Sequence, residues 1–111
     1  MNQVIHYPNL RSFMKRHQIT IKDLAKILNK SYPTVHQKIT RKKTKHGKVS
    51  LFDIEEAGTI ISFVIHTEQE YLKQKFGDKW EEEWNLRWGH IHDWLKYLFF
   101  DEMVTNATKS A

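Results

Sequence analysis

Two groups of side chains in the second half of the sequence are of types that metal sites and hydrolytic enzymes use. Histidine and aspartate occur together in Gly89-His90-Ile91-His92-Asp93, and three carboxylates follow one another at residues 81–83. On a helix, His90 and His92 would point about 200° apart, so they cannot bind one ion together. Paired catalytic carboxylates need an apolar pocket that separates their pKa values, and no such pocket is indicated here. Because the sequence also lacks a phosphate-binding glycine loop and a nucleophile elbow, we predict no metal, no cofactor and no enzymatic activity.

Positive charge is concentrated in the first half of the chain. Residues 1–50 contain 12 Lys or Arg and one acid, whereas residues 51–111 contain 6 Lys or Arg and 12 Asp or Glu. The densest run is RKKTKHGK at residues 41–48, where the cations repel one another unless an anion neutralises them. A basic half indicates a polyanionic partner only weakly, because lysine-rich solvated surfaces are common.

Apolar spacing and capping residues predict an all-α fold. We expect helices at about 9–17, 21–28, 31–39, 51–64, 67–76 and 79–103. Capping boxes are predicted at residues 20–23, 50–53, 67–70 and 78–81. Asn29 is expected to end the second helix in the left-handed conformation. Ser31 is expected to cap the third helix, which places Pro33 in a first turn that needs no amide hydrogen.

The segment LAKILNKSYPTVHQKI, from Leu24 to Ile39, resembles the helix-turn-helix of the lambda repressor/Cro-like (XRE-type) family of bacterial and phage regulators. Ala25 is small where two helices cross closely, and Asn29 takes the turn position usually held by glycine. Val35 and Ile39 would pack the helix at 31–39 onto Leu24 and Leu28 of the helix before it. The resemblance covers about residues 8–65 and implies a lambda repressor-like domain at 1–66. A C-terminal helical region at 67–104 and a disordered tail at 105–111 remain, and an ordinary helical hairpin is the alternative interpretation.

The resemblance also implies a binding surface for double-stranded DNA. The helix that begins at Ser31 would lie in the major groove, where the Gln37 amide can hydrogen-bond adenine at N6 and N7 together. The amides at the Thr20 helix start would suit a phosphate. The basic run at residues 41–48 departs from the family, being longer and more basic than the usual connection. Because its cations repel one another, we expect it to track phosphates or enter the minor groove, a solvated loop being the alternative. The implied contacts are Thr20, Ser31, Tyr32, Pro33, Thr34, His36, Gln37, Lys38, Arg41, Lys42, Lys43, Lys45 and Lys48.

An apolar stripe follows the predicted last helix. Its members recur at steps of about three and four residues: Trp80, Trp84, Trp88, Ile91, Leu95, Leu98 and Phe99. In one interpretation this helix packs back on the basic module and completes its core. In the other, which we favour, the stripe pairs with a second copy, because helix-turn-helix proteins read two half-sites. Gly89 within the stripe marks a close crossing or a kink.

Together these features predict a sequence-specific DNA-binding transcriptional regulator, a repressor that acts as a homodimer. The alternative is a phage-encoded inhibitor, antirepressor or antitoxin that keeps a helix-turn-helix scaffold and binds another protein through its aromatic face. No apolar run is long enough to cross a membrane, and cysteine and a signal-peptide pattern are both absent. We therefore expect a cytoplasmic location, at the nucleoid or in the cytoplasm of a phage host.

Overall fold

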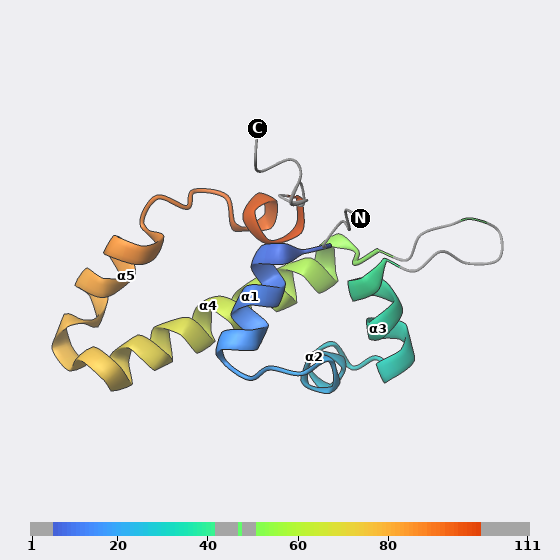
Figure 1. Cartoon of the computed structure of the whole chain (residues 1–111), viewed down its shortest axis with the longest axis horizontal. Coiled ribbons are helices and arrows are strands. Elements are labelled where there is room, and N and C mark those ends of the chain that lie inside the picture. The colour runs from blue at the N-terminus through green and yellow to red at the C-terminus, as the bar shows by residue number, and fades with distance from the viewer. Residues whose placement is uncertain (1–5, 42–46, 48–50, 101–111) are drawn as a thin grey trace, which may run out of the picture.

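The computed structural model describes residues 6–41, 47 and 51–100, and every regular element within them is a helix (Figure 1). The elements are α1 (Pro8–Arg16), α2 (Ile21–Leu28), α3 (Tyr32–Thr40), α4 (Ile54–Phe76), the 3-10 turn η1 (Gly77–Lys79), α5 (Trp80–Trp88) and the π-helical turn η2 (Lys96–Phe100). The predicted all-α class is confirmed. Among these helices, none combines the length and apolar character needed to cross a lipid bilayer.

The long helix α4 organises the molecule (Figure 1). Helix α2 packs against α4 and against α3, which lies at the end of the molecule away from α5. Helix α5 folds back on the far part of α4, after Gly77 has ended α4 with a positive φ of 57°. The chain then returns along the molecule, so that η2 lies against α1. The beginning and the end of the described chain therefore meet.

One apolar core joins both halves of the chain. Its buried side chains are Tyr7, Leu10, Phe13, Met14, Leu24, Ala25, Val35, Ile39, Ala57, Ile60, Val64, Leu98 and Phe99. The predicted inner side of α3 is confirmed, because its two apolar residues four positions apart are both buried. The core also includes two side chains of η2, far along the sequence from the α1 residues that they contact.

The local signals around α2 and α3 are confirmed. Thr20 and Asp23 form a capping box, with the Asp23 amide donating to the Thr20 hydroxyl over 3.1 Å and the Thr20 amide donating to the Asp23 carboxylate over 2.9 Å. Asn29 ends α2 in the left-handed region at φ 56° and ψ 44°. Ser31 caps α3, and Pro33 lies in the first turn of that helix.

Two predicted helix starts and one predicted cap are wrong. Helix α4 is capped by Asp53, which forms a capping box with Glu56, so it begins three residues later than predicted. It then continues through the predicted start at 67–70 and across the predicted domain boundary at residue 66. The Thr67 hydroxyl donates to the Phe63 carbonyl within the same helix, at 2.7 Å, as mid-helix threonines do. Helix α5 follows η1 without a side-chain cap from residue 78. In the first case a capping box three residues later starts the helix, and in the second the helix is continuous because its inner side stays buried through Val64, Glu68 and Leu72.

The single long helix predicted for residues 79–103 is also wrong. Helix α5 ends at Trp88, and the Gly89 amide makes its last hydrogen bond, to the Asn85 carbonyl at 3.0 Å. A Cβ atom at Gly89 would lie 2.5 Å from that carbonyl oxygen, so the position favours glycine. The chain leaves the helix here and becomes helical again shortly before η2. The apolar spacing extends beyond Trp88 to Phe99, but the helix does not, and this is why the prediction failed.

Candidate functional site

The outward side of α3 presents an aromatic and amide-bearing surface. Tyr32, Pro33, His36 and Gln37 are exposed, and together they line a shallow depression of about 250 Å³. The rings of Tyr32 and His36 stack with their centroids 5.8 Å apart and their planes inclined by 25°. The structure thus brings four of the predicted contact residues together on one face. We call these four residues the α3 face.

Ser31 and Thr34, two further predicted DNA contacts, lie at the N-terminal end of α3. The hydroxyl oxygens of Ser31 and Thr34 are 2.8 Å apart and share a hydrogen bond, and the Ser31 oxygen also accepts from the Thr34 amide at 3.4 Å. Both side chains therefore hold the first turn of α3 together. Ser31 remains exposed, while Thr34 is half-buried.

The structure turns Lys38 towards the protein. Its ammonium group contacts both carboxylate oxygens of Glu56 at 2.7 and 2.8 Å, and only 18% of the lysine side chain is exposed. Glu56 is itself buried and closes the capping box of α4. This pair anchors α3 to the start of α4, so Lys38 serves the fold and does not belong to the outward surface of α3.

Arg41 is similarly directed towards the fold. It ends α3 in the left-handed conformation at φ 53°, and its guanidinium carbon lies 5.9 Å from the centre of the Tyr7 ring. Its charge is therefore next to the core and away from the α3 face. The other members of the predicted basic contact run, Lys42, Lys43, Lys45 and Lys48, lie outside the described residues.

The predicted phosphate site at the start of α2 is already occupied by a carboxylate. The backbone amide of Thr20 is the largest influence that lowers the pKa of Asp23, and the Thr20 hydroxyl and nearby Lys26 lower it further. Asp23 is therefore charged at neutral pH and satisfies the positive end of the helix. An incoming phosphate would meet like charge there, so Thr20 is a capping residue and a poor phosphate ligand.

Two exposed lysines, one in α2 and one in the turn between α2 and α3, supply positive charge that was not predicted. Lys22 and Lys30 are exposed and form no ion pair with any residue between 6 and 41 or between 51 and 100. Lys30 lies in the turn that leads directly into the cap of α3. The signal in the sequence was that residues 1–50 contain one acid, Asp23, which caps α2.

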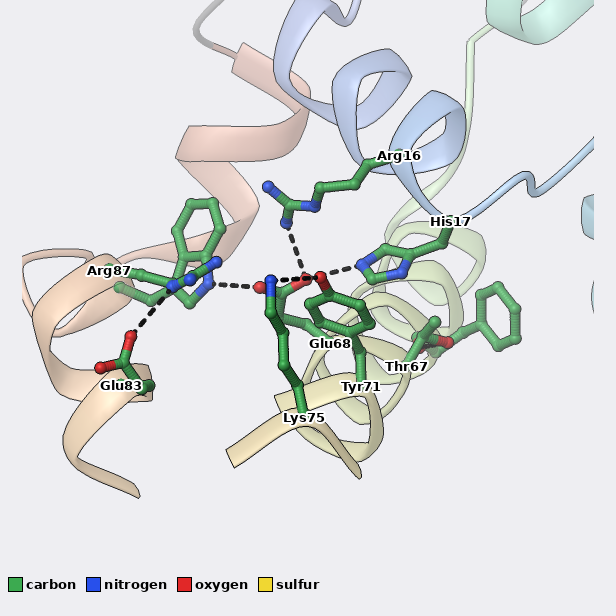
Figure 2. A network of polar contacts seen from close by, with 10 residues as sticks. Arg16, His17, Thr67, Glu68, Tyr71, Lys75, Glu83 and Arg87 are labelled. Carbon is green, nitrogen blue, oxygen red and sulfur yellow. Dashed lines mark hydrogen bonds and ion pairs between the residues drawn. The ribbon is translucent and has the colours of Figure 1, made fainter. Parts of the chain in front are cut away.

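A buried carboxylate lies away from the α3 face and was not predicted (Figure 2). Glu68 has no exposed side-chain area, and its Oε1 contacts the Arg16 guanidinium at 2.7 Å and His17 Nε2 at 2.6 Å. Its Oε2 accepts a hydrogen bond from Trp88 Nε1 at 2.9 Å. Val64 and Leu72, four residues before and after it, are both buried. This helical spacing placed Glu68 on the inner side of α4 and could have identified it from the sequence.

The surroundings of Glu68 indicate a structural role, in which its charged carboxylate connects neighbouring helices. Burial raises the pKa of Glu68, but the hydrogen bonds from Trp88 and His17 and the charge of Arg16 outweigh that effect and hold the pKa below its ordinary value. Arg16 also lies over the rings of Phe13 and Trp88, at 4.9 and 5.3 Å from their centres. The carboxylate therefore connects α1, α4 and α5, with both oxygens engaged.

The predicted dimerisation stripe divides where α5 ends. Trp80, Trp84 and Trp88 lie on α5, whereas Leu98 and Phe99 of η2 are buried in the core of the same chain. Ile91 lies between the two helical segments and Leu95 packs against that core.

The tryptophans of α5 have partners within the chain as well. Trp88 packs on Phe13 with ring centroids 4.8 Å apart, and Trp84 stacks on Trp94 at 6.0 Å. The ammonium group of Lys73 lies over the Trp80 ring, 4.9 Å from its centre. The second half of the stripe thus completes the core, as the intramolecular interpretation expected.

No metal site is formed by the described part of the chain, where no three His, Cys, Asp or Glu side chains lie close enough to hold an ion. His90 and His92 lie in the connection after α5 rather than on a helix. Comparisons with protein-family models, with curated proteins and with solved structures give no match for this chain.

Proposed function

We propose that the protein is a sequence-specific DNA-binding transcriptional regulator, in which α2 and α3 act as a helix-turn-helix and α3 enters the major groove. The observation that carries this proposal is the α3 face. Its tyrosine opens a capped helix whose other side is buried, and its histidine and glutamine follow about one turn later on the exposed side. The first residues of a recognition helix are those that reach base edges.

The side chains of the α3 face suit this role in different ways. Gln37 can donate to and accept from adenine together, which is direct reading of a base pair. Tyr32 can contact a thymine methyl group or a phosphate, and Ser31 can reach the backbone beside it. Lys22 and Lys30, which form no ion pair with the described residues, provide positive charge that phosphates would neutralise.

The attachment of α3 also favours reading over mere electrostatic binding. Lys38 ties the helix to Glu56 of α4, and Arg11 of α1 donates to the Ile39 carbonyl at 3.1 Å. Two neighbouring helices thus hold the far end of α3. A rigid support of this kind keeps reading side chains in a fixed position relative to the bases. We propose that occupancy of an operator by this helix represses transcription.

The experiment is selection of duplexes from random DNA, followed by fluorescence anisotropy with the selected site. Gln37→Ala should relax the preference at one base pair by about 1–3 kcal/mol without abolishing binding. Gln74→Ala is the matched control, because Gln74 is equally an exposed helical glutamine but lies on α4. Failure of the wild-type protein to bind any duplex at low salt would refute the proposal.

One observation favours a second candidate, a protein-binding inhibitor that acts through α5. None of the nine residues of α5 is fully buried, and Leu86 is 77% exposed. An apolar residue this exposed on a short aromatic helix is a possible contact for another protein. Sequence-selective DNA binding that depends on Gln37 but not on Leu86 would decide in favour of the regulator.

A further inference from the structure

Three of the large apolar side chains that the structure leaves exposed lie around one cavity. Leu51 is 49% exposed, Ile54 is 72% exposed and Phe100 is 64% exposed, and all three line a cavity of about 510 Å³. They come from the residues before α4, the start of α4 and the end of η2. We call these three side chains and the cavity the apolar rim.

The cavity itself is mainly apolar. Its walls include Phe52, Ala57, Leu95 and Phe99, all of which belong to the core or pack against it. Tyr7 joins these walls from the residue that precedes α1. An apolar cavity of roughly 150 Å³ is already large enough to hold benzene. The cavity could therefore receive an aromatic or a branched aliphatic side chain from outside.

We infer that the apolar rim pairs with the apolar rim of a second copy of this chain. A two-fold interface brings the same surface of both copies together, so that surface must carry both the projecting groups and the hollow that receives them. The apolar rim has both, since Ile54 and Phe100 project beside the cavity. Exposed apolar clusters of this kind mark interaction sites more often than isolated apolar residues do.

The charges at the cavity are also self-complementary. Arg41 and Asp53 both line it, so one cation and one anion lie on the same surface. Because a group of each sign lines the cavity, pairing two copies does not bring a surface of a single sign against itself. A partner of strongly acidic or strongly basic character would gain less from this balanced surface.

This surface differs from the tryptophan stripe and from the α3 face. Arg41 ends α3, so the C-terminal end of that helix reaches the apolar rim. Pairing there would fix the distance between the two α3 helices and hence the spacing of two half-sites. That last step rests on the proposed function, whereas the association of two copies does not.

The association is tested by sedimentation velocity of the full chain, without DNA, over a wide range of protein concentration. The wild-type protein should show a concentration-dependent dimer. Ile54→Asp and Phe100→Asp should each raise the dimer dissociation constant roughly tenfold or more, because each would place a charge in an apolar interface. Both side chains are mostly exposed in the single chain, so circular dichroism melting should show that each variant still folds.

Leu86→Asp is the matched control, because Leu86 is as exposed as these residues but lies on α5. It should leave the dimer dissociation constant unchanged. The inference is overturned if the wild-type protein remains monomeric, if Ile54→Asp or Phe100→Asp has no effect, or if Leu86→Asp weakens association as much as they do. A dimeric protein that binds no DNA would count against the proposed function and leave the apolar rim as the interface.

Discussion

The indole nitrogen of Trp88 on α5 lies 2.9 Å from the buried carboxylate of Glu68 on α4 and donates a hydrogen bond to it. The other oxygen of the same carboxylate is held by Arg16 and His17 from the end of α1 (Figure 2). One acidic side chain thus connects three segments that are far apart in the sequence. Removing the Trp88 donor should weaken the attachment of α5, none of whose residues is fully buried.

Trp88→Phe should lower the free energy of unfolding by about 1–3 kcal/mol, because it leaves one oxygen of a buried carboxylate without its donor. Urea denaturation followed by circular dichroism measures the change. Trp84→Phe is the matched control on the same helix, since Trp84 stacks on Trp94 but makes no hydrogen bond within the described residues. Equal losses from the two substitutions would show that the hydrogen bond contributes nothing specific.

The stability of the protein should fall in acid through Glu68. Its pKa in the folded protein lies below the ordinary value of 4.5. The free energy that the charged Glu68 carboxylate contributes to folding is therefore complete at pH values above 4.5. It is lost as the pH falls through the pKa of Glu68 in the folded protein. Urea denaturation at a series of pH values below neutrality should show this decline.

Glu68→Gln removes the titrating group and should give a flatter decline in acid, together with a loss of about 1–3 kcal/mol at neutral pH. Glu70→Gln is the control, because Glu70 forms only a surface ion pair with Lys73. Its pH profile should match that of the wild-type protein. A Glu68→Gln profile as steep as the wild-type profile would assign the acid sensitivity to other carboxylates.

The turn between α2 and α3 should prefer glycine to alanine at position 29. Asn29 has a φ of 56°, a left-handed conformation that a Cβ atom makes costly. Asn29→Ala should lower the free energy of unfolding by about 1 kcal/mol, whereas Asn29→Gly should not. Thermal melting of both variants measures the difference, and identical melting temperatures would contradict a strained turn.

Lys38 should matter for stability and not for the salt dependence of DNA binding. Lys38→Met leaves the buried Glu56 carboxylate without its cation and should cost about 1–3 kcal/mol of unfolding free energy. Its effect on the slope of log K against log salt should be close to zero. A slope flattened by about one unit would mean that Lys38 leaves Glu56 and contacts a phosphate.

Lys22→Ala and Lys30→Ala should behave in the opposite way. Each should flatten the salt slope by about one if its ammonium group contacts a phosphate, with little change in stability. The basic run predicts contacts by Arg41, Lys42, Lys43 and Lys45; since Arg41 packs on Tyr7, the three lysines alone are changed to alanine, and this should flatten the slope further on every DNA sequence. Anisotropy titrations at several salt concentrations compare these variants, and unchanged slopes would exclude the lysines as contacts.

The sequence predicted α1 to α3 well because each of those helices has its own local signals. The Thr20 capping box, Asn29 and Ser31 act within a few residues, and nothing in the tertiary structure opposes them. The α3 face followed from the same spacing, since burial of one side of a short helix leaves the other side exposed. What the sequence could not show was that Lys38 would find Glu56, because that pair joins two different helices.

The second half was predicted less well because local and long-range effects conflict there. Thr67 begins a plausible capping box, yet the inner side of α4 continues through Val64, Glu68 and Leu72, and burial decides. Beyond Gly89 the apolar period continues, but the side chains turn to α1 and no longer share one helix. The spacing of apolar residues predicts which side chains are buried. It does not predict which helix of the protein they pack against.

The return of η2 to α1 has a consequence for how this chain folds as it is made. Asn9 donates a hydrogen bond to the carbonyl of Tyr97, 88 residues later, and Leu98 and Phe99 cover the same core as Tyr7. Until those late residues leave the ribosome, the inner side of α1 has no complete cover. Closing so long a loop costs conformational entropy, so the last step of folding should be slow compared with formation of the individual helices. The growing chain would therefore carry exposed aromatic surface until residues 97–99 emerge.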